Sequence, residues 1–231
     1  MHCPSVWICG LAGGCIIVNS EQLERMGFVE GDVVESIITT LSSDQEFNAA
    51  PMGVWVHPDH QLIIRPYEGT QTASNIQDVG EAVINITHDP HVFLVTAFKE
   101  ELSSSPQFEF ESAITVKAPR LAGMSGYLEV TVEPKLVEED TPRYRELLCT
   151  LQHIEIASPF PVVLSRARCA AIECVIHATR VRAFHTIDEA TTQRLVHRID
   201  DLRTLVNRIA AKSPAAEVIQ KVIEMLPRWT K

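Results

Sequence analysis

The sequence lacks several features that would assign it to a well-defined class of protein. Its six cysteines include no C-x-x-C pair, and their spacing matches neither zinc ligands nor a disulfide-stapled secreted scaffold. We therefore expect reduced, mostly buried thiols and a cytoplasmic location. No G-x-S-x-G elbow and no Walker loop are present, so no motif supports a hydrolase or a nucleoside triphosphatase.

Basic residues are few relative to acidic ones. The chain has 20 Lys and Arg against 30 Asp and Glu, a formal net charge of −10. This balance argues against a broad nucleic-acid surface, because neutralising phosphates requires clustered cations. A single Arg beside helix N–H groups could still bind a small anion. The 231 residues are 45% hydrophobic, which is enough for a sizeable core.

We do not expect the apolar start of the chain to be a membrane segment. Residues 1–20 lack the basic start of a signal peptide, and glycines interrupt an apolar run that is too short to span a bilayer. We expect an N-terminal extension over residues 1–32, with an additional strand or a loose segment first. One or two helical turns are expected at Glu21–Gly27, before the turn signal Gly31-Asp32.

What the chain does contain is a series of closely spaced strand patterns. The turn dipeptide Pro58-Asp59 separates two apolar runs and predicts a hairpin. Such spacing predicts a β-barrel, with a short polar helix at Thr70–Gly80 crossing one end. Strands are expected at Val33–Leu41, Phe47–Val56, Leu62–Pro66, Glu81–Thr87, Phe108–Val116 and Tyr127–Val137.

The pattern changes at about Glu138–Pro142. Beyond it Tyr144–Ala157 is ambiguous, and earlier in the chain Val92–Phe98 could be helix or strand. The predicted fold is mainly β (α+β), with a barrel over residues 33–140 and a mostly helical part over 141–231 that packs on the barrel or on a second subunit. Helical periodicity marks Ser165–Arg182, Asp188–Ala211 and Ala215–Leu226.

Polar groups concentrate at the start of the predicted polar helix. Thr70, Thr72 and Asn75 follow Arg65 closely. Hydroxyls and an amide at a helix start, beside unpaired backbone N–H groups, can bind an anion such as a phosphate, and an arginine adds a charge-assisted contact. The alternative is an ordinary N-cap, in which Thr70 or Thr72 only accepts a backbone N–H.

Together these motifs resemble the FMN-binding split-barrel superfamily, which includes flavin reductases and pyridoxine-phosphate-oxidase-like proteins. Closer still, Glu35–Thr40, Asn48–Gly53 and Ala170–Arg180 resemble one branch, a domain-of-unknown-function family associated with tetrahydromethanopterin-linked one-carbon metabolism. The superfamily pattern consists of a strand ending Thr39-Thr40, the stretch Asn48–Gly53 (Asn-Ala-Ala-Pro-Met-Gly), Arg65, the pattern Thr70-x-Thr72-x-x-Asn75-Ile76 and a strand ending Val83-x-Asn85.

This resemblance implies a split barrel that binds FMN near the interface of a homodimer. Small residues at Asn48–Gly53 would let the backbone approach the flavin ring, whereas a turn that leads into a strand is the alternative for this stretch. FMN is favoured over FAD because no G-x-G-x-x-G fingerprint is present. The residues implied at the cofactor are Thr39, Asn48, Ala49, Ala50, Met52, Gly53, Arg65, Thr70, Thr72 and Asn75.

Glu173, His177 and Arg180 would share one face of a helix. They could position a substrate or move a proton beside a flavin. Alternatively, Glu173 and His177 form an intrahelical pair and Arg180 caps the helix or bridges to the barrel. No metal site is expected, because the H-x-x-H pairs at His57 and His88 lie beside Pro and Asp in turns and lack further ligands at suitable spacing.

The function implied by the resemblance is that of an FMN-dependent oxidoreductase acting on a small, for example pterin-like, substrate. An alternative is a non-catalytic FMN-binding or accessory protein of a one-carbon pathway. A third is a structural protein whose site has lost its ligand. Bound flavin would separate the third from the other two, and reduction with turnover would separate the first from the second.

Overall fold

The computed structural model describes residues 7–8, 16–17, 20–31, 33–57, 61–102, 108–134, 145–157 and 165–230. The chain forms two compact units, one of residues 1–86 with 108–158 and one of residues 87–107 with 159–231. The chain therefore leaves the first unit and returns to it before completing the second. Cys3, Cys9, Cys15 and His60 lie outside the described residues, as does half of the expected extension.

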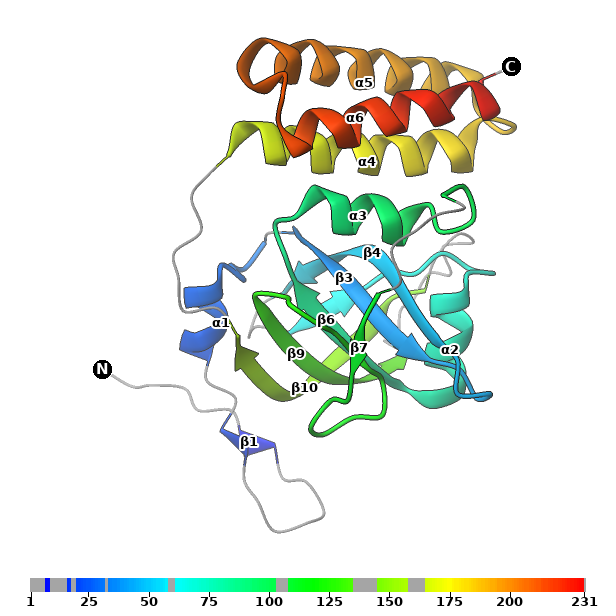
Figure 1. Ribbon diagram of the computed structural model, residues 1–231. Coiled ribbons are helices and arrows are strands. Elements are labelled where there is room, and N and C mark those ends of the chain that lie inside the picture. Colours follow the sequence, from blue (N-terminus) through cyan, green and yellow to red (C-terminus); the bar gives the residue numbers. More distant parts are fainter. Residues whose placement is uncertain are drawn as a thin grey trace. The chain divides into compact units, whose positions relative to one another are not determined.

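A closed six-stranded antiparallel barrel forms the centre of the first unit (Figure 1). The expected barrel is therefore confirmed, and the ambiguous segment before Ala157 supplies the strand that closes it. The strand order is β10-β5-β4-β3-β6-β9, with β9 also paired to β10. The strands are β3 (Val33–Leu41), β4 (Phe47–Val56), β5 (Leu62–Ile64), β6 (Glu81–Ile86), β9 (Gly126–Pro134) and β10 (Leu147–Ile156).

Two expectations from the sequence are corrected. The expected boundary at residue 140 cuts the barrel, because β10 belongs to the first unit. The strand expected at Phe108–Val116 is wrong. Only β7 (Phe110–Glu111) is extended there, paired with β8 (Arg120–Leu121).

Before α1 (Ser20–Met26), the expected additional strand is present as β1 (Trp7–Ile8), paired with β2 (Ile16–Ile17).

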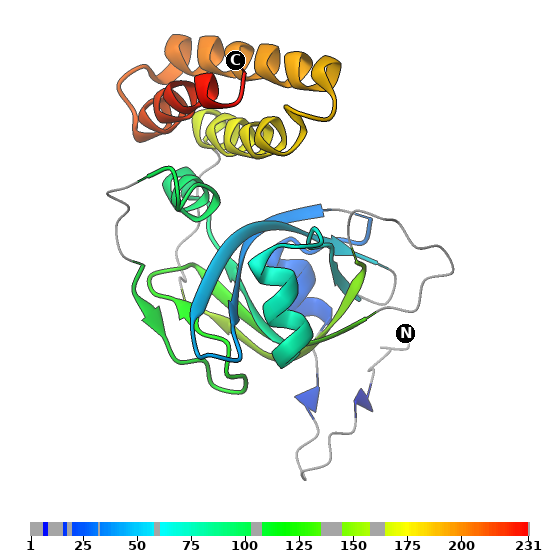
Figure 2. The same ribbon diagram turned by 90° about the vertical axis from the view of Figure 1, so that its right-hand side faces the viewer.

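The barrel interior follows from the two-residue alternation of its strands. Helix α1 adds Leu23 to this core, and helix α2 (Gln71–Val79) adds Ile76. Figures 1 and 2 show the two helices at opposite ends of the barrel, with α2 across one end as the sequence predicted. The inward side chains that are at most 1% exposed include Ile38, Val54, Ile64, Ile84 and Val130.

The second unit is helical. Helix α4 (Arg166–Phe184) packs against α3 (Pro90–Ala97), α5 (Glu189–Ala210) and α6 (Pro214–Met225), and the 3-10 helix η2 (Leu226–Arg228) follows. The undecided segment at Val92–Phe98 is thus helical, with an Asp N-cap and Pro at the first helical position. The helical periodicity expected in the C-terminal part is confirmed.

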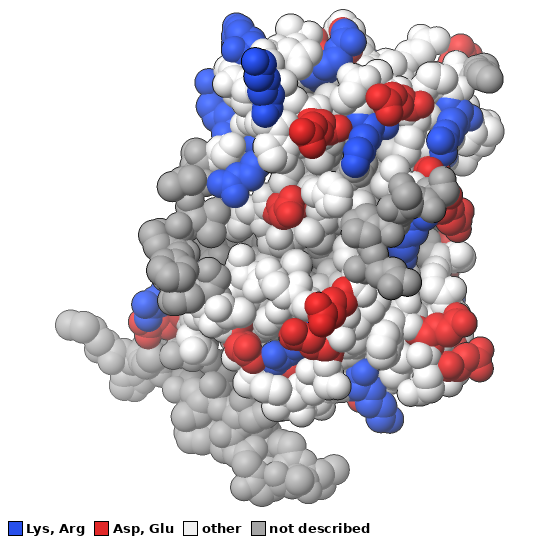
Figure 3. Space-filling view, viewed as in Figure 1, with Lys and Arg blue, Asp and Glu red and all other residues white. Residues whose placement is uncertain are grey.

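Charged side chains of both signs are interspersed on the face drawn in Figure 3. Ion pairs at exposed positions include Arg145 with Glu68 at 3.1 Å and Arg203 with Asp200. Among the helices in the described part of the chain, none is long and apolar enough to cross a membrane.

Candidate functional site

Four buried polar side chains join α2 to strands β3 and β4. The Asn48 amide nitrogen donates to Thr72 Oγ1 at 3.0 Å and to Thr40 Oγ1 at 3.5 Å. The Asn75 amide nitrogen donates to Thr40 Oγ1 at 3.0 Å. All four residues are at most 8% exposed. We call Thr40, Asn48, Thr72 and Asn75 the α2 anchor, because its hydrogen bonds hold the helix against the barrel.

The anchor divides the phosphate candidates into two groups. Thr72 and Asn75 face the barrel and are only 3% and 1% exposed. Thr70 is exposed and is the N-cap of α2, where its hydroxyl accepts from the Ala73 N–H at 3.3 Å and donates to the Tyr67 carbonyl at 2.8 Å. The first-turn N–H groups of Gln71 and Thr72 have no acceptor within the helix. The first turn therefore presents backbone donors and the Thr70 hydroxyl at its surface, beside the exposed Gln71 side chain.

Arg65 follows β5 and contacts both a carboxylate and an aromatic ring. Its guanidinium forms an ion pair with Glu146 and lies over the Trp55 ring, with 4.5 Å from Cζ to the ring centroid. The side chain is 23% exposed. A bound anion would therefore share Arg65 with Glu146. No sequence pattern indicates this ion pair, because Arg65 and Glu146 are brought together by the pairing of β5 with β10.

The Asn48–Gly53 stretch runs along β4 beside β3. By the alternation of the strand, Ala50 and Met52 turn inward, and Met52 packs against the core. Ala49, Pro51 and Gly53 turn outward, where Ala49 is 2% exposed while Pro51 and Gly53 are half-buried. A Cβ added at Gly53 would lie 2.9 Å from Val33 Cγ1. The outward side of β4 thus presents only small groups between Phe47 and Trp55.

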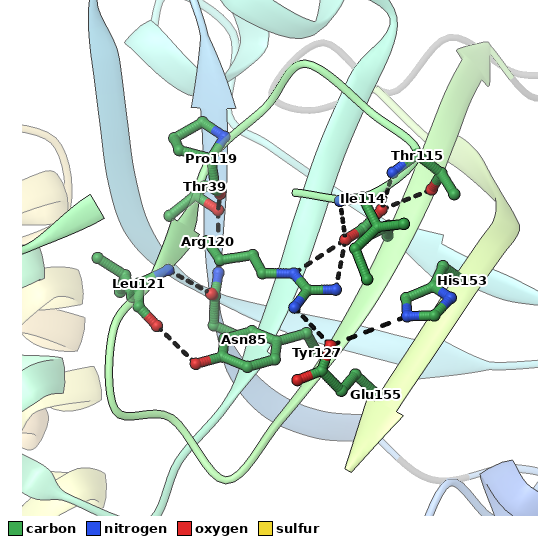
Figure 4. Close-up of polar contacts among 11 residues, drawn as sticks. Thr39, Asn85, Ile114, Thr115, Pro119, Arg120, Leu121, Tyr127, His153 and Glu155 are labelled. Carbon is green, nitrogen blue, oxygen red and sulfur yellow. Dashed lines mark hydrogen bonds and ion pairs between the residues drawn. The ribbon is translucent and has the colours of Figure 1, made fainter. Parts of the chain in front are cut away.

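A loop over residues 112–119 crosses the outer side of the barrel and is fastened there by a buried carboxylate (Figure 4). Glu129 on β9 accepts from the N–H groups of Ile114 at 2.8 Å and Thr115 at 2.6 Å, and from Arg120 Nε at 2.9 Å. Arg120 also pairs with Glu155 at 2.6 Å. Because side chains alternate along β9, Glu129 points away from the barrel interior, but no sequence pattern indicates its burial beneath a loop.

Thr39 lies beneath this loop, although the sequence resemblance placed it at the cofactor. Its hydroxyl donates to the Pro119 carbonyl and accepts from the Asn85 amide at 3.0 Å, and the residue is 0% exposed. The same Asn85 accepts from the Leu121 N–H at 2.8 Å. In this structure Thr39 and Asn85 hold the loop to β3 and β6.

Glu173, His177 and Arg180 lie on α4, in the second unit. His177 Nε2 is 3.2 Å from Glu173 Oε1, as the intrahelical alternative predicted. Burial lowers the pKa of His177, with the Glu173 charge opposing it. The ring is 3% exposed, while Arg180 is exposed. The contact with Glu173 and the burial of the His177 side chain identify His177 as part of the packing of the helical unit.

Among the described residues, cysteines and potential metal ligands add no further site. Burial raises the pKa of Cys149 and of Cys174 to about 12, so both thiols stay protonated at neutral pH, and Cys169 is exposed. Within the ranges that the structure describes, no group of three or more His, Cys, Asp and Glu side chains lies together as a metal site requires.

Comparison with known proteins identifies the family. The sequence model of the family "Protein of unknown function (DUF447) N-terminal domain" matches residues 34–158, more than half of the chain. An FMN-bound protein assigned to DUF447 from Methanosarcina mazei has a similar structure, with a TM-score of 0.67 and 20% identity over 87% of this chain and 98% of that one.

Two further solved structures are less similar. Flavoredoxin of Desulfovibrio vulgaris has a TM-score of 0.42 at 12% identity, over 54% of this chain and 69% of its own. The styrene monooxygenase flavin reductase from Pseudomonas putida S12 has a TM-score of 0.44 at 11% identity, over 57% and 93%. The family assignment rests on the match of the sequence model and on the Methanosarcina structure. The chain belongs to the DUF447 N-terminal domain family and shares the fold of that FMN-bound protein.

Proposed function

We propose that the barrel binds FMN and that the protein is an FMN-dependent oxidoreductase acting on a small, for example pterin-like, substrate. The observation that carries the proposal is the similarity, over 87% of the chain, to a family member that is FMN-bound. Bound FMN would supply hydride or electron transfer, and the chain's own residues would bind and orient the reactants.

The residues around β4 and α2 fit such a ligand. The small outward groups at Pro51 and Gly53 leave the β4 backbone open to a planar ring. The first turn of α2 offers Thr70 and backbone donors to a phosphate, and Arg65 could contribute a charge-assisted contact beside Glu146. The buried or inward members of the predicted set, Thr39, Asn48, Ala49, Ala50, Met52, Thr72 and Asn75, would support this surface from behind.

A second candidate is a non-catalytic FMN-binding or accessory protein of a one-carbon pathway. The observation that favours it is the state of His177, the acid–base candidate, which is buried and paired within α4. A carrier or sensor needs the flavin site alone and no proton donor beside it.

The proposal includes a homodimer with FMN near the interface, in the cytoplasm, without nucleic-acid or membrane partners. The strand order closes the barrel, but β5 pairs with β4 only over Val54–Val56. Support for an interface also comes from side chains. Phe47 is 53% exposed, its ring lies 5.1 Å from that of Phe110, and the Phe110 ring lies 6.5 Å from that of Phe108. Exposed aromatic groups of this kind are enriched at protein interfaces.

The test is the visible spectrum of the purified protein after incubation with FMN and desalting. We expect about one retained flavin per chain and, by light scattering, a particle of twice the 25.7 kDa chain mass. Bleaching by NADH or NADPH with turnover on an added acceptor supports the oxidoreductase, and a flavin that no reductant bleaches supports the second candidate. Absence of any retained flavin overturns both.

Arg65→Ala tests the phosphate end of the site. Loss of a charge-assisted contact should weaken FMN binding by about ten- to a hundredfold, measured by quenching of flavin fluorescence. Arg145→Ala is the matched control, because Arg145 also contacts α2, through Gln77 at 3.3 Å, but pairs with Glu68 at an exposed position. Equal affinities for both variants would remove Arg65 from the site.

A further inference from the structure

Thr40 is the residue at which the hydrogen bonds of the α2 anchor meet. Its hydroxyl oxygen accepts one amide N–H from Asn48 on β4 and another from Asn75 on α2, while Thr40 itself lies on β3. One oxygen thus joins three elements at a position that is 0% exposed. A buried amide donor left without an acceptor is costly, so the arrangement fixes α2 relative to both strands.

The chain of contacts continues from Thr40 to the first turn of the helix. Asn75 uses both ends of its amide, donating to Thr40 and accepting from the Gln71 side-chain nitrogen at 2.6 Å. Gln71 is the first residue of α2 and follows the N-cap Thr70 directly. The far end of the helix is also held, because the Val132 N–H donates to the Gly80 carbonyl at 2.8 Å. The direction of the first-turn N–H groups is therefore determined by contacts with the barrel.

We infer that Thr40 is a positioning residue for the flavin phosphate, acting through Asn75 and Gln71 on the orientation of the α2 first turn. This inference rests on the proposed function. Thr40 is buried and has no surface to offer a ligand. Its effect is directional, because a hydrogen bond weakens steeply as the N–H turns away from its acceptor. Loss of the Thr40 hydroxyl would therefore change the contacts to the phosphate and leave those to the flavin ring.

The experiment compares Thr40→Val with Thr40→Ser in the full-length protein loaded with FMN. Valine keeps the shape and removes the acceptor, whereas serine keeps the hydroxyl. For Thr40→Val we expect an FMN Kd raised about tenfold, the loss of roughly one good contact to the phosphate. The ³¹P resonance of bound FMN should move toward that of free FMN, while the absorbance spectrum of the bound flavin stays as in the unsubstituted protein. Thr40→Ser should restore both values.

Thr131→Val is the matched control. Thr131 on β9 also accepts an amide N–H at 3.0 Å, from Gln152, but takes no part in the α2 anchor. The control should leave the Kd and the ³¹P resonance unchanged. If Thr40→Val does not fold, Thr72→Val removes only the Asn48–Thr72 bond and should shift both readouts in the same direction by less.

An unchanged ³¹P resonance and Kd in Thr40→Val overturn the inference. A variant whose flavin absorbance changes as much as its ³¹P resonance overturns it as well, because the hydroxyl then supports the whole site. Failure of the unsubstituted protein to bind FMN overturns the proposed function itself, and the inference with it. The two failures are thus distinguished by the unsubstituted protein alone.

Discussion

Glu129 is a carboxylate that the barrel buries completely and surrounds with donors. Burying such a charge without partners costs several kcal/mol. Here the N–H groups of Ile114 and Thr115, the Thr115 hydroxyl and Arg120 all donate to it. Burial raises the pKa of Glu129, but the hydrogen bonds led by Thr115 outweigh that effect and hold the pKa below its ordinary value of 4.5.

Glu129→Gln should lower the free energy of unfolding by about 3 kcal/mol, because one backbone donor and Arg120 lose a charged acceptor in a buried place. The measurement is urea unfolding at neutral pH. Glu155→Gln is the control, since Glu155 pairs with the same Arg120 but is 40% exposed. Its loss should cost less than about 1 kcal/mol. Equal losses in the two variants would contradict this account of Glu129.

The same carboxylate makes the free energy of unfolding depend on pH, with a defined sign. A group whose pKa is lower in the folded state adds stability above its unfolded-state pKa, and that stability disappears as the pH falls through the folded-state value. The contribution of Glu129 to stability should therefore be present above about pH 4.5 and be lost as the pH falls from there through the lower pKa of the folded state. The unfolding free energies of the unsubstituted protein and Glu129→Gln should converge in acid.

At the scale of single elements, α2 depends on its ends. Its nine residues QTASNIQDV include only two large apolar side chains, and an isolated helix of this length is marginal in water. The helix is stabilised instead by the Thr70 N-cap, the left-handed Gly80 C-cap and the α2 anchor. Any ligand at its first turn therefore depends on contacts made at its sides and at its far end.

Gly80→Ala should destabilise the protein by about 1 kcal/mol, measured by urea unfolding. Gly80 has φ of 69°, where an L side chain is strained. A Cβ there would lie 3.5 Å from the Val132 carbonyl oxygen, an ordinary contact, so the cost comes from the backbone. Gly80→Asn is the control and should lose less, because Asn adopts this conformation more readily. A larger loss for Asn would point to crowding instead.

The elements that sequence patterns predicted are those governed by local apolar runs or periodicity. Val33–Leu41 and Glu81–Ile86 are nearly continuous runs that are buried on both sides of the strand, and α5 and α6 follow their apolar stripes. The predicted strand after Phe108 failed because Glu129, far along the chain, holds that segment as an irregular loop. Sequence alone could not tell that of two adjacent threonines, Thr40 joins the anchor and Thr39 joins the loop.

At the scale of the whole molecule, the family match and the compact units do not coincide. The match ends at residue 158 and includes α3, whereas the helices that pack on α3 begin at residue 166. Phe93 and Leu94 of α3 are each 0% exposed in the complete chain. A fragment that follows the family boundary would lack α4 and α6, the helices that pack on α3.

A fragment of residues 1–158 should therefore self-associate, because the apolar side of α3 loses its cover. Light scattering and binding of a dye specific for apolar surfaces measure this directly. The control is the same fragment with Phe93→Gln and Leu94→Gln, which should stay dispersed. A dispersed fragment with native Phe93 and Leu94 would show that α3 does not need its helical partners.

Because the helical unit is built from two separate segments, residues 87–107 and 159–231, its parts are synthesised at different times. Helix α3 leaves the ribosome about 70 residues before α4 begins, an interval of about 4 to 14 s at ordinary translation rates. During that interval β9 and β10 are made, so every strand of the barrel exists before the partners of α3 do. Nascent chains thus pass through a stage with a complete barrel sequence but without α4 and α6, which pack on α3, and we expect the apolar residues of α3 to be accessible to chaperones at that stage.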